Sequence, residues 1–527
     1  MRRLELVAVL GAVGIALWWL GAILIGAVPL DYLGDEAARL LESLKASSLE
    51  GVVSLLTEGA RWVELHPPGD AAFRGLITWA AGPMVSSPDS LVRLQQFISF
   101  TCVTGGIGIA AHGIRQRWGA TSAITFALGA MASSPVVYVA HHIIGEAPTV
   151  LFVGLAIHAA VVRNPTDGRW PYSVGLPLLA AALFRPEAAV VFGGLALIPL
   201  HQRRVRAAAI VGAFAVAFPV FTTIAVEVSS NPGSYASIRL FARINFVDVV
   251  TDDRMREIIW GLGVIPYLGI GFFIAVLGAA ASDRRLSLGA LLTTGWLALA
   301  VLFTSQIAVG AIHQQERAYV FPALFGLFAV AVVVGERSRS PSGRIVVVIV
   351  SALAVTSALV STVQQTYPAW QDRVPQDARE VSTVLADRSG PDDAILLDWL
   401  WWQEWRAAIY ASGASNSIRY CLYYECMTHS QPGLVDTSGL SQENAKRLTA
   451  AATFVRDQRP LHVVVFSEEK QRMWDEWRSN QEPFPSFVRP LFTPNEDRCW
   501  VARAELGGAL YCPVMSNESY VVFELVP

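Results

Sequence analysis

The chain has 527 residues, of which 53% are apolar and only 16% are charged, and its mean hydropathy is +0.43. A soluble protein of this length carries roughly a quarter charged residues, so the composition excludes an ordinary soluble protein. The net charge of -3 indicates no particular partner because the charges are segregated among loops, and we expect no nucleic-acid ligand.

Uncharged runs long enough to cross a bilayer recur along the first two thirds of the chain. A spanning helix needs about 20 apolar residues, and the runs 6–30, 119–145, 207–226 and 261–282 provide them. The first run is too long for a cleaved signal peptide and lacks a small-x-small cleavage site. The fold class we predict is therefore mainly α, a polytopic membrane protein with about 11 transmembrane helices.

The arginines predict which loops lie inside the cell, because cytoplasmic loops carry an excess of Lys and Arg. The basic segments are the N-terminus and the loops around 115–117, 163–169, 203–206, 284–285 and 337–344. The loops between them carry acids and histidines, so we place them outside. A single span over 170–200 would invert every later loop, and we read that stretch as a short hairpin broken at Arg185.

The first outer loop, residues 31–93, begins with Asp35 and Glu36 directly after the first span. The apolar residues that follow recur on one helical face, which predicts an amphipathic helix along the membrane surface. Adjacent residues on a helix point about 100° apart, so the two acids cannot serve one site equally. They either stabilise the start of this helix through its dipole or take part in a reaction.

The other candidate site residues are charged side chains and histidines in the outer loops. They are His66, Glu146, Arg185, Glu187, His313, Glu316 and Arg317. Each alone fits an interface residue that is paired or that extends toward water. Together they suit a reaction between a lipid-borne anion and an acceptor in water, since arginines bind phosphate and a carboxylate accepts a proton.

The composition changes near residue 366, and residues 366–527 are polar and rich in tryptophan. Segments 378–399 and 459–469 resemble a helix followed by a short apolar strand, which predicts a small α/β domain. We therefore divide the chain into a membrane module, residues 1–365, and an extracytoplasmic domain, residues 366–527.

Four of the five cysteines lie in this C-terminal domain. Their clustering fits disulfides outside the cytoplasm. We favour Cys421–Cys426 and Cys499–Cys512, while other pairings or free thiols remain open. Cys102 lies within a span and is interpreted as a packed small residue.

Several motifs together resemble a known family. They are DYLGDEAAR after the first span, HPPGDAAF late in the first outer loop, an acid in the second outer loop, FRPEA at a span boundary and ERAYVFP at a late span. In this layout residues 1–365 resemble the GT-C glycosyltransferases, and within them the branch of the protein O-mannosyltransferases and the lipid A aminoarabinose transferase. The C-terminal domain contributes nothing to the resemblance.

The resemblance implies a polyprenyl-phosphate-linked sugar donor that is made in the cytoplasm and used on the outer face of the cell membrane. It implies that Asp35 is the general base and that Glu146 is the family's acid of the second outer loop. One base suffices for an inverting displacement, and Arg185 or Arg317 would meet the charge of the leaving lipid phosphate. The further substrate-binding candidates are Glu36, His66, Glu187 and His313.

Some choices stay open at the level of the sequence. Mg²⁺ or Mn²⁺ bridging Asp35 and Glu146 to the phosphate is one of them, because oxygen ligands suit both ions. The acceptor is a lipid, a cell-wall glycan or a secreted protein. A flippase for a lipid-linked sugar would more often carry ionisable residues in mid-span or inverted repeats, and neither is visible. A non-catalytic membrane scaffold leaves Asp35 and Glu146 unexplained.

The proposed topology can be tested with tags. A tag after Pro527 should be accessible from outside intact cells, and a tag between Ser338 and Gly343 should not, because the arginines there favour the cytoplasm. Accessibility to an impermeant reagent is the measurement. The reverse pattern would contradict the placement of every proposed site loop.

Overall fold

The computed structural model describes residues 2–24, 68–81, 88–228 and 320–337, with short pieces within 288–293. It also describes the C-terminal part from residue 376, where the larger gaps are 390–392, 398–418, 422–430 and 470–487. The chain divides into two compact units. One is helical and holds most of the described residues up to 337. The other contains the described residues from 376 onward, and each unit is considered by itself.

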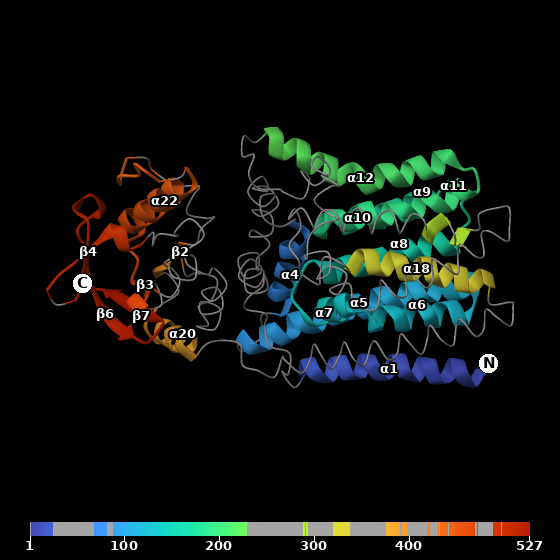
Figure 1. Ribbon diagram of the computed structural model, residues 1–527, viewed down its shortest axis with the longest axis horizontal. Coiled ribbons are helices and arrows are strands. Elements are labelled where there is room, and N and C mark those ends of the chain that lie inside the picture. Colours follow the sequence, from blue (N-terminus) through green and yellow to red (C-terminus); the bar gives the residue numbers. More distant parts are fainter. Residues whose placement is uncertain are drawn as a thin grey trace. The chain divides into compact units, whose positions relative to one another are not determined.

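The helical unit is a bundle of helices that lie along one another (Figure 1). Its larger elements are α1 (Arg2–Leu24), α4 (Pro68–Ala81), α5 (Pro88–Trp118), α6 (Ala120–Ala132), α7 (Ser134–His141), α8 (Glu146–Val162), α9 (Trp170–Phe184), α10 (Pro186–Phe192), η2 (Gly193–Ala196), α11 (Leu197–His201), α12 (Val205–Val228) and α18 (Val320–Arg337). One apolar cluster runs through it, and Trp19, Trp170, Phe192 and Phe325 are fully buried members. Burial of these large side chains holds the bundle together.

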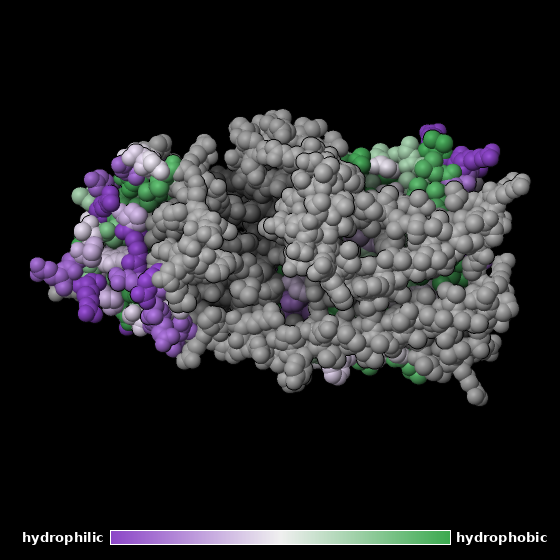
Figure 2. Space-filling view, viewed as in Figure 1, coloured by the Kyte–Doolittle hydropathy of each residue, from purple (hydrophilic) through white to green (hydrophobic). Residues whose placement is uncertain are grey.

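The helices of this unit fit a membrane environment, but the described residues do not establish the number of spans. Among them Ser90–Trp118 is long and apolar enough to cross a bilayer, and Ala120–Met131 with Pro135–His141 qualifies if this pair, bent by 68°, is one span. Pro135 lies at the start of α7, where its missing N–H favours a break. Figure 2 shows mainly hydrophobic patches on the described surface of the helical unit and mainly hydrophilic ones on the other unit. The total of about 11 spans stays a prediction.

Residues 170–200, which the sequence predicts to form a short hairpin, do form one. Helix α9 ends at Phe184, Arg185 has an extended backbone, and α10 begins at Pro186 and packs back against α9. The indole of Trp170 donates to the carbonyl of Ala160 over 3.3 Å, so the start of α9 lies beside the end of α8. Glu146 and Arg185, which lie at the other ends of α8 and α9, are thereby brought to the same end of the unit.

The basic loops gather at the opposite end. Near its own C-terminus, helix α18 lies against the junction of α5 and α6, where Gly335 packs against Trp118. The α8–α9 loop, the α11–α12 turn and the N-terminus lie at this end as well (Figure 1). Among the described residues, the bundle therefore separates these basic segments from Glu146, Arg185 and Glu187, which agrees with the charge distribution along the sequence.

Glycines let two of the helices approach at the level of their backbones. A Cβ atom added at Gly154 of α8 would overlap the carbonyl oxygen of Gly106 in α5, and one added at Gly106 would overlap the carbonyl of Val150. Small residues at such crossings allow close packing of membrane helices. Helices α5 and α8 are consequently in close contact where these residues meet.

The second unit has a seven-stranded sheet in the order β2-β1-β3-β7-β6-β5-β4. Its elements are α20 (Gln376–Arg388), β1 (Ala394–Leu397), β2 (Arg419–Cys421), α22 (Gln442–Gln458), β3 (His462–Phe466), η6 (Arg489–Leu491), β4 (Phe492–Pro494), β5 (Trp500–Ala502), η7 (Ala504–Leu506), β6 (Leu510–Ser516) and β7 (Tyr520–Leu525). Strand β1 runs parallel to β2 and β3, and the remaining pairs are antiparallel. The predicted α/β character is confirmed, including the helix and strand within 378–399.

The core of this unit lies between its sheet and α22. All five residues of β3 are buried, and Leu448, Ala452 and Val455 of α22 belong to the same apolar cluster. Parallel strands covered on a face by helices read as continuous apolar runs, which explains the sequence HVVVF. The sequence pattern is thus accounted for by burial.

The cysteines have different environments. Cys499 and Cys512, 13 residues apart, form a disulfide that links β6 to the residue before β5, the pairing favoured from the sequence. Cys421 ends β2, but Cys426 lies outside the described residues, so that pairing stays a prediction. Cys102 is a buried thiol within α5, which agrees with its interpretation as a packed small residue.

The glycine contact between α5 and α8 gives a test of the packing. Gly154→Ala should destabilise the protein by about 1–3 kcal/mol, because the methyl group forces the two backbones apart. Gly108→Ala on α5 is the matched control, since a Cβ there has no neighbour within 4 Å. The control should be neutral or stabilising by up to about 1 kcal/mol through helix propensity. Thermal unfolding of the full chain in detergent is the measurement, and equal losses would contradict the close packing.

Candidate active site

The polar site begins at Glu146, the first residue of α8. The side chain is 3% exposed, so its carboxylate is almost completely removed from solvent. The N-terminus of a helix favours negative charge because the backbone dipoles point their positive ends there. The position therefore stabilises a carboxylate that would otherwise be costly to bury.

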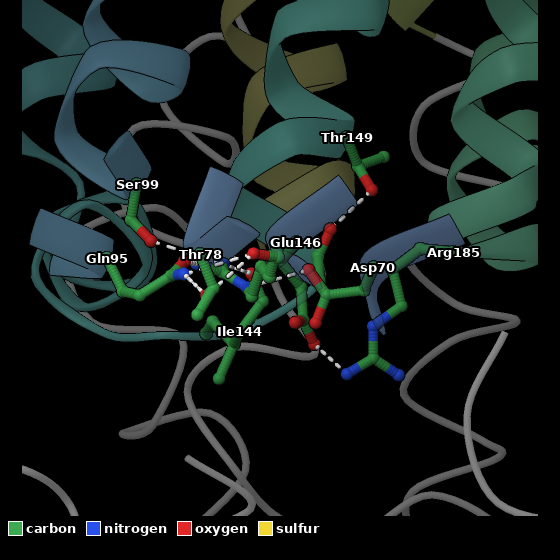
Figure 3. A network of polar contacts seen from close by, with 10 residues as sticks. Asp70, Thr78, Gln95, Ser99, Ile144, Glu146, Thr149 and Arg185 are labelled. Atoms are coloured by element: carbon green, nitrogen blue, oxygen red, sulfur yellow. Dashed lines mark hydrogen bonds and ion pairs between the residues drawn. The ribbon is translucent and has the colours of Figure 1, made fainter. Parts of the chain in front are cut away.

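The partner of Glu146 is Arg185, at the turn between α9 and α10. One guanidinium nitrogen, Nη2, lies 2.6 Å from Oε1 of Glu146, and Nη1 lies 3.7 Å from Oε1 of Glu187. Arg185 precedes Pro186, which is consistent with its extended backbone. The break in the hairpin thus places a guanidinium beside the first turn of α8 (Figure 3).

This arrangement can bind an anion. The Arg185 side chain is 15% exposed and that of Glu187 is 35% exposed, so both are partly accessible. A guanidinium forms two-pronged hydrogen bonds to phosphate or carboxylate. Glu146 neutralises that charge in the present arrangement, and a phosphate reaching Arg185 would share or replace this partner.

A second polar cluster, centred on Arg74 of α4, lies beside the first. Its Nε donates to Oδ1 of Asp70 at 2.9 Å and its Nη1 to Oε1 of Gln95 at 3.1 Å. Its Nη2 donates to Oγ of Ser99 at 3.2 Å and to the carbonyl of Ile144 at 2.9 Å. Arg74 and Asp70 are both 0% exposed, so a complete ion pair is buried within the helices.

The acceptors around Arg74 are themselves held in place. Gln95 donates to the hydroxyl of Thr78 at 3.0 Å and to the carbonyl of Arg74 at 3.3 Å, and Thr78 donates to that same carbonyl at 2.9 Å. Such a network is stable in an apolar interior only when its polar groups are satisfied. Figure 3 shows Gln95, Thr78 and Ser99 gathered on one side of the network, with Asp70 on the side toward Arg185.

Two further contacts join α4 to the end of α9, just before Arg185. A Cβ at Gly69 would lie 2.6 Å from the carbonyl oxygen of Leu183, so the backbones touch there. The rings of Phe73 and Phe184 meet edge to face with centroids 5.8 Å apart. Helix α4 therefore contacts Leu183 and Phe184, which precede Arg185. Through Arg74 it also contacts Ile144, which lies two residues before Glu146.

The structure brings three of the predicted site residues together: Glu146, Arg185 and Glu187. The other predicted residues lie outside the described part of the chain, and they are Asp35, Glu36, His66, His313, Glu316 and Arg317. Within the described residues no group of three His, Cys, Asp or Glu side chains is placed to hold a metal ion. The divalent cation, which involves Asp35, stays a prediction.

Asp70 and Arg74 were not among the predicted site residues, although Asp70 belongs to the HPPGDAAF motif. A signal was present, since an acid and an arginine four residues apart follow Pro67-Pro68 at the start of an otherwise apolar helix. Gln95 and Ser99 in α5 are a second signal, because they also lie four residues apart and so on one face of a helix. What the sequence could not show is that these two faces meet.

Comparison of the whole fold finds similar solved structures. The chain has a fold similar to that of ArnT, a GT-C glycosyltransferase, which agrees with the resemblance in its sequence motifs. One such structure is ArnT from Cupriavidus metallidurans bound to undecaprenyl phosphate, with a TM-score of 0.55 and 13% identity over 98% of this chain and 97% of that one. The apo state of ArnT matches with a TM-score of 0.50 and 12% identity, over 97% and 98%. No family model and no curated protein match the sequence.

Proposed function

We propose that this chain is an integral membrane glycosyltransferase. It moves a sugar from a polyprenyl-phosphate-linked donor to a hydroxyl group of an acceptor at the outer face of the cell membrane, with inversion at the anomeric carbon. Its N-terminus is cytoplasmic and its C-terminal α/β domain is extracytoplasmic. The fold supports the class of enzyme, and the segregation of basic loops at one end of the helices supports the orientation.

The observation that carries the proposal is the Glu146–Arg185 ion pair at the end of the helices opposite the basic loops, at a distance of 2.6 Å. In the solved relative the ligand is undecaprenyl phosphate, a lipid with a phosphate headgroup. A phosphate offers more charge and more acceptor oxygens than a carboxylate, so it competes well for a guanidinium. Arg185 is therefore assigned to the phosphate of the lipid donor.

The reaction follows from these groups. Asp35 takes the proton of the acceptor hydroxyl while that oxygen attacks the anomeric carbon. The bond between the anomeric carbon and the phosphate oxygen breaks, and the lipid phosphate leaves with both electrons of that bond. Arg185 stabilises the charge that develops on the phosphate, and Glu146 orients the guanidinium. A single base is sufficient because only one displacement occurs.

The remaining candidates act around this centre. Arg317 is a second cation for the phosphate, and a divalent cation held by Asp35 and Glu146 would supply additional positive charge. Substrate contacts are assigned to Glu36, His66, Glu187 and His313. The acceptor class is open among a lipid, a glycan and a secreted protein, and mass spectrometry of envelope lipids and glycans with and without the gene would identify it.

The assignment of Asp35 predicts a specific loss. Asp35→Asn keeps the size of the side chain but removes its ability to accept a proton, so turnover should fall by roughly 10²- to 10⁴-fold. Binding of the donor should survive because arginines hold the phosphate. The measurement is formation of the glycosylated product, identified by mass spectrometry, at saturating donor.

Glu36→Gln is the control for that experiment. It removes one negative charge from the same helix start, an effect worth at most about 1 kcal/mol at an exposed site. Its loss of turnover should be much smaller because the side chain points elsewhere on the helix. Equal and mild losses in both variants would indicate a structural pair of acids and would exclude Asp35 as the base.

The assignment of Arg185 predicts a change in lipid binding. Arg185→Gln should weaken binding of undecaprenyl phosphate roughly 10- to 100-fold, since hydrogen bonds to charged groups contribute about 1.5–3 kcal/mol. Glu146→Gln should not weaken binding, because it removes a negative charge beside the phosphate, although turnover should fall. Binding is measured by the ligand-induced shift in thermal stability of the purified protein.

Arg169→Gln is the matched control, because Arg169 is exposed and precedes the same helix that Arg185 follows. It should bind undecaprenyl phosphate as the unchanged protein does. If Arg185→Gln and Arg169→Gln behave alike, the phosphate is bound elsewhere. Binding without any product in the unchanged protein would instead favour a transporter of a lipid-linked sugar.

A further inference from the structure

We propose that Arg74 is a positioning residue for the Glu146–Arg185 pair, acting through the backbone at the start of α8. The inference rests on the proposed function insofar as that pair binds the donor phosphate. Arg74 does not contact the pair directly. Its role is to fix the position of the Glu146 backbone, from which the carboxylate reaches Arg185. Arg74 thereby links α4, which lies in the later part of the first outer loop, to the second outer loop.

The geometry around Arg74 requires a guanidinium. Four of its five N–H donors are bonded, to acceptors on α4, on α5 and in the loop between α7 and α8. The planar fork fixes the directions of these donors, whereas the ammonium of a lysine has three donors around a single point. Only an arginine can therefore hold the three segments in one arrangement.

The bond that matters for the site is the one from Nη2 to the carbonyl of Ile144, at 2.9 Å. Ile144 lies two residues before Glu146, and the same carbonyl accepts the backbone N–H of Ala147 at 3.1 Å. The hydroxyl of Thr149 donates to the carbonyl of Gly145 at 2.7 Å. The backbone of Glu146 thus lies between two neighbours whose carbonyls are hydrogen-bonded, and Arg74 holds the first of them from outside the helix.

Helix α4 also positions the other partner. Gly69 lies one turn before Arg74 and lets the backbone of α4 touch the carbonyl of Leu183, two residues before Arg185. One short helix therefore sets the place of both backbones from which the ion pair is made. A shift of α4 would change the distance between the carboxylate and the guanidinium, which is now 2.6 Å.

A buried ion pair such as Asp70–Arg74 could serve folding alone, because many such pairs contribute to structure without any effect on a site. The two roles differ in how substitutions combine. If Arg74 acts through Glu146, its substitution matters only while Glu146 is present. If it only stabilises the fold, its effect on turnover is the same with and without Glu146.

The experiment is a double-mutant cycle in the full chain with Arg74→Lys and Glu146→Gln. Arg74→Lys should lower turnover 10-fold or more, and the double variant should be no slower than Glu146→Gln within about twofold. Losses that multiply would overturn the proposal. Ser99→Ala, which removes one acceptor and keeps the charge, should show the same pattern with a smaller loss and guards against a failure of Arg74→Lys to fold.

A second measurement does not depend on activity. Hydrogen exchange of the amides over residues 143–149 should be faster in Arg74→Lys than in the unchanged protein, while α12 and the sheet of the C-terminal unit keep their protection. Ser122→Ala is the control, because Ser122 is equally buried but lies in α6, away from the cluster. Unchanged exchange at 143–149, or faster exchange everywhere, would overturn the positioning role. If Glu146→Gln proves fully active, the proposed function fails, yet the exchange result still decides whether Arg74 holds the start of α8.

Discussion

A charged side chain can be buried among apolar helices only where other polar groups surround it, and this constraint organises the helical unit. Arg74 is fully buried and requires Asp70 as its counter-charge, together with acceptors from α5 and from the loop before α8. Glu146 and Arg185 satisfy the same requirement between α8 and the α9–α10 turn. The helices that meet at this end are those that must meet to keep these charges paired.

Hydrogen bonds of about 3 Å can join helices only where their backbones come close. Gly106 and Gly154 let α5 and α8 touch, and Gly69 lets α4 touch the end of α9. The long Arg74 side chain spans from α4 to α5, where the short side chain of Ser99 accepts one of its hydrogen bonds. The glycine contacts and the polar cluster thus involve the same helices, α4, α5 and α8.

Under the proposed function, the pairing of Glu146 with Arg185 would hold a charged guanidinium ready for a phosphate in a poorly hydrated place. An unpaired guanidinium would be costly there, whereas a carboxylate partner keeps it charged and oriented. Preorganised charge of this kind contributes to catalysis because the site does not have to rearrange in the transition state. ArnT, to which this chain is similar in fold, was solved with a lipid-borne anion, undecaprenyl phosphate.

Composition, periodicity and the positions of the arginines predict much of what the structure describes: a helical module, the hairpin at Arg185, the distance of Glu146 and Arg185 from the described basic loops, and the helix and strand within 378–399. These are local or additive properties, so they can be read along the chain. The sequence also predicted Glu146 and Arg185 as site residues, but not that they form a pair, and Asp70 and Arg74 were not among the predicted site residues. Which side chains meet depends on contacts over long separations, such as the 70 residues between Arg74 and Ile144. Only the packing of α4, α5 and α8 decides them, because one turn of a helix moves a side chain by about 5.4 Å along its axis, farther than any hydrogen bond can reach.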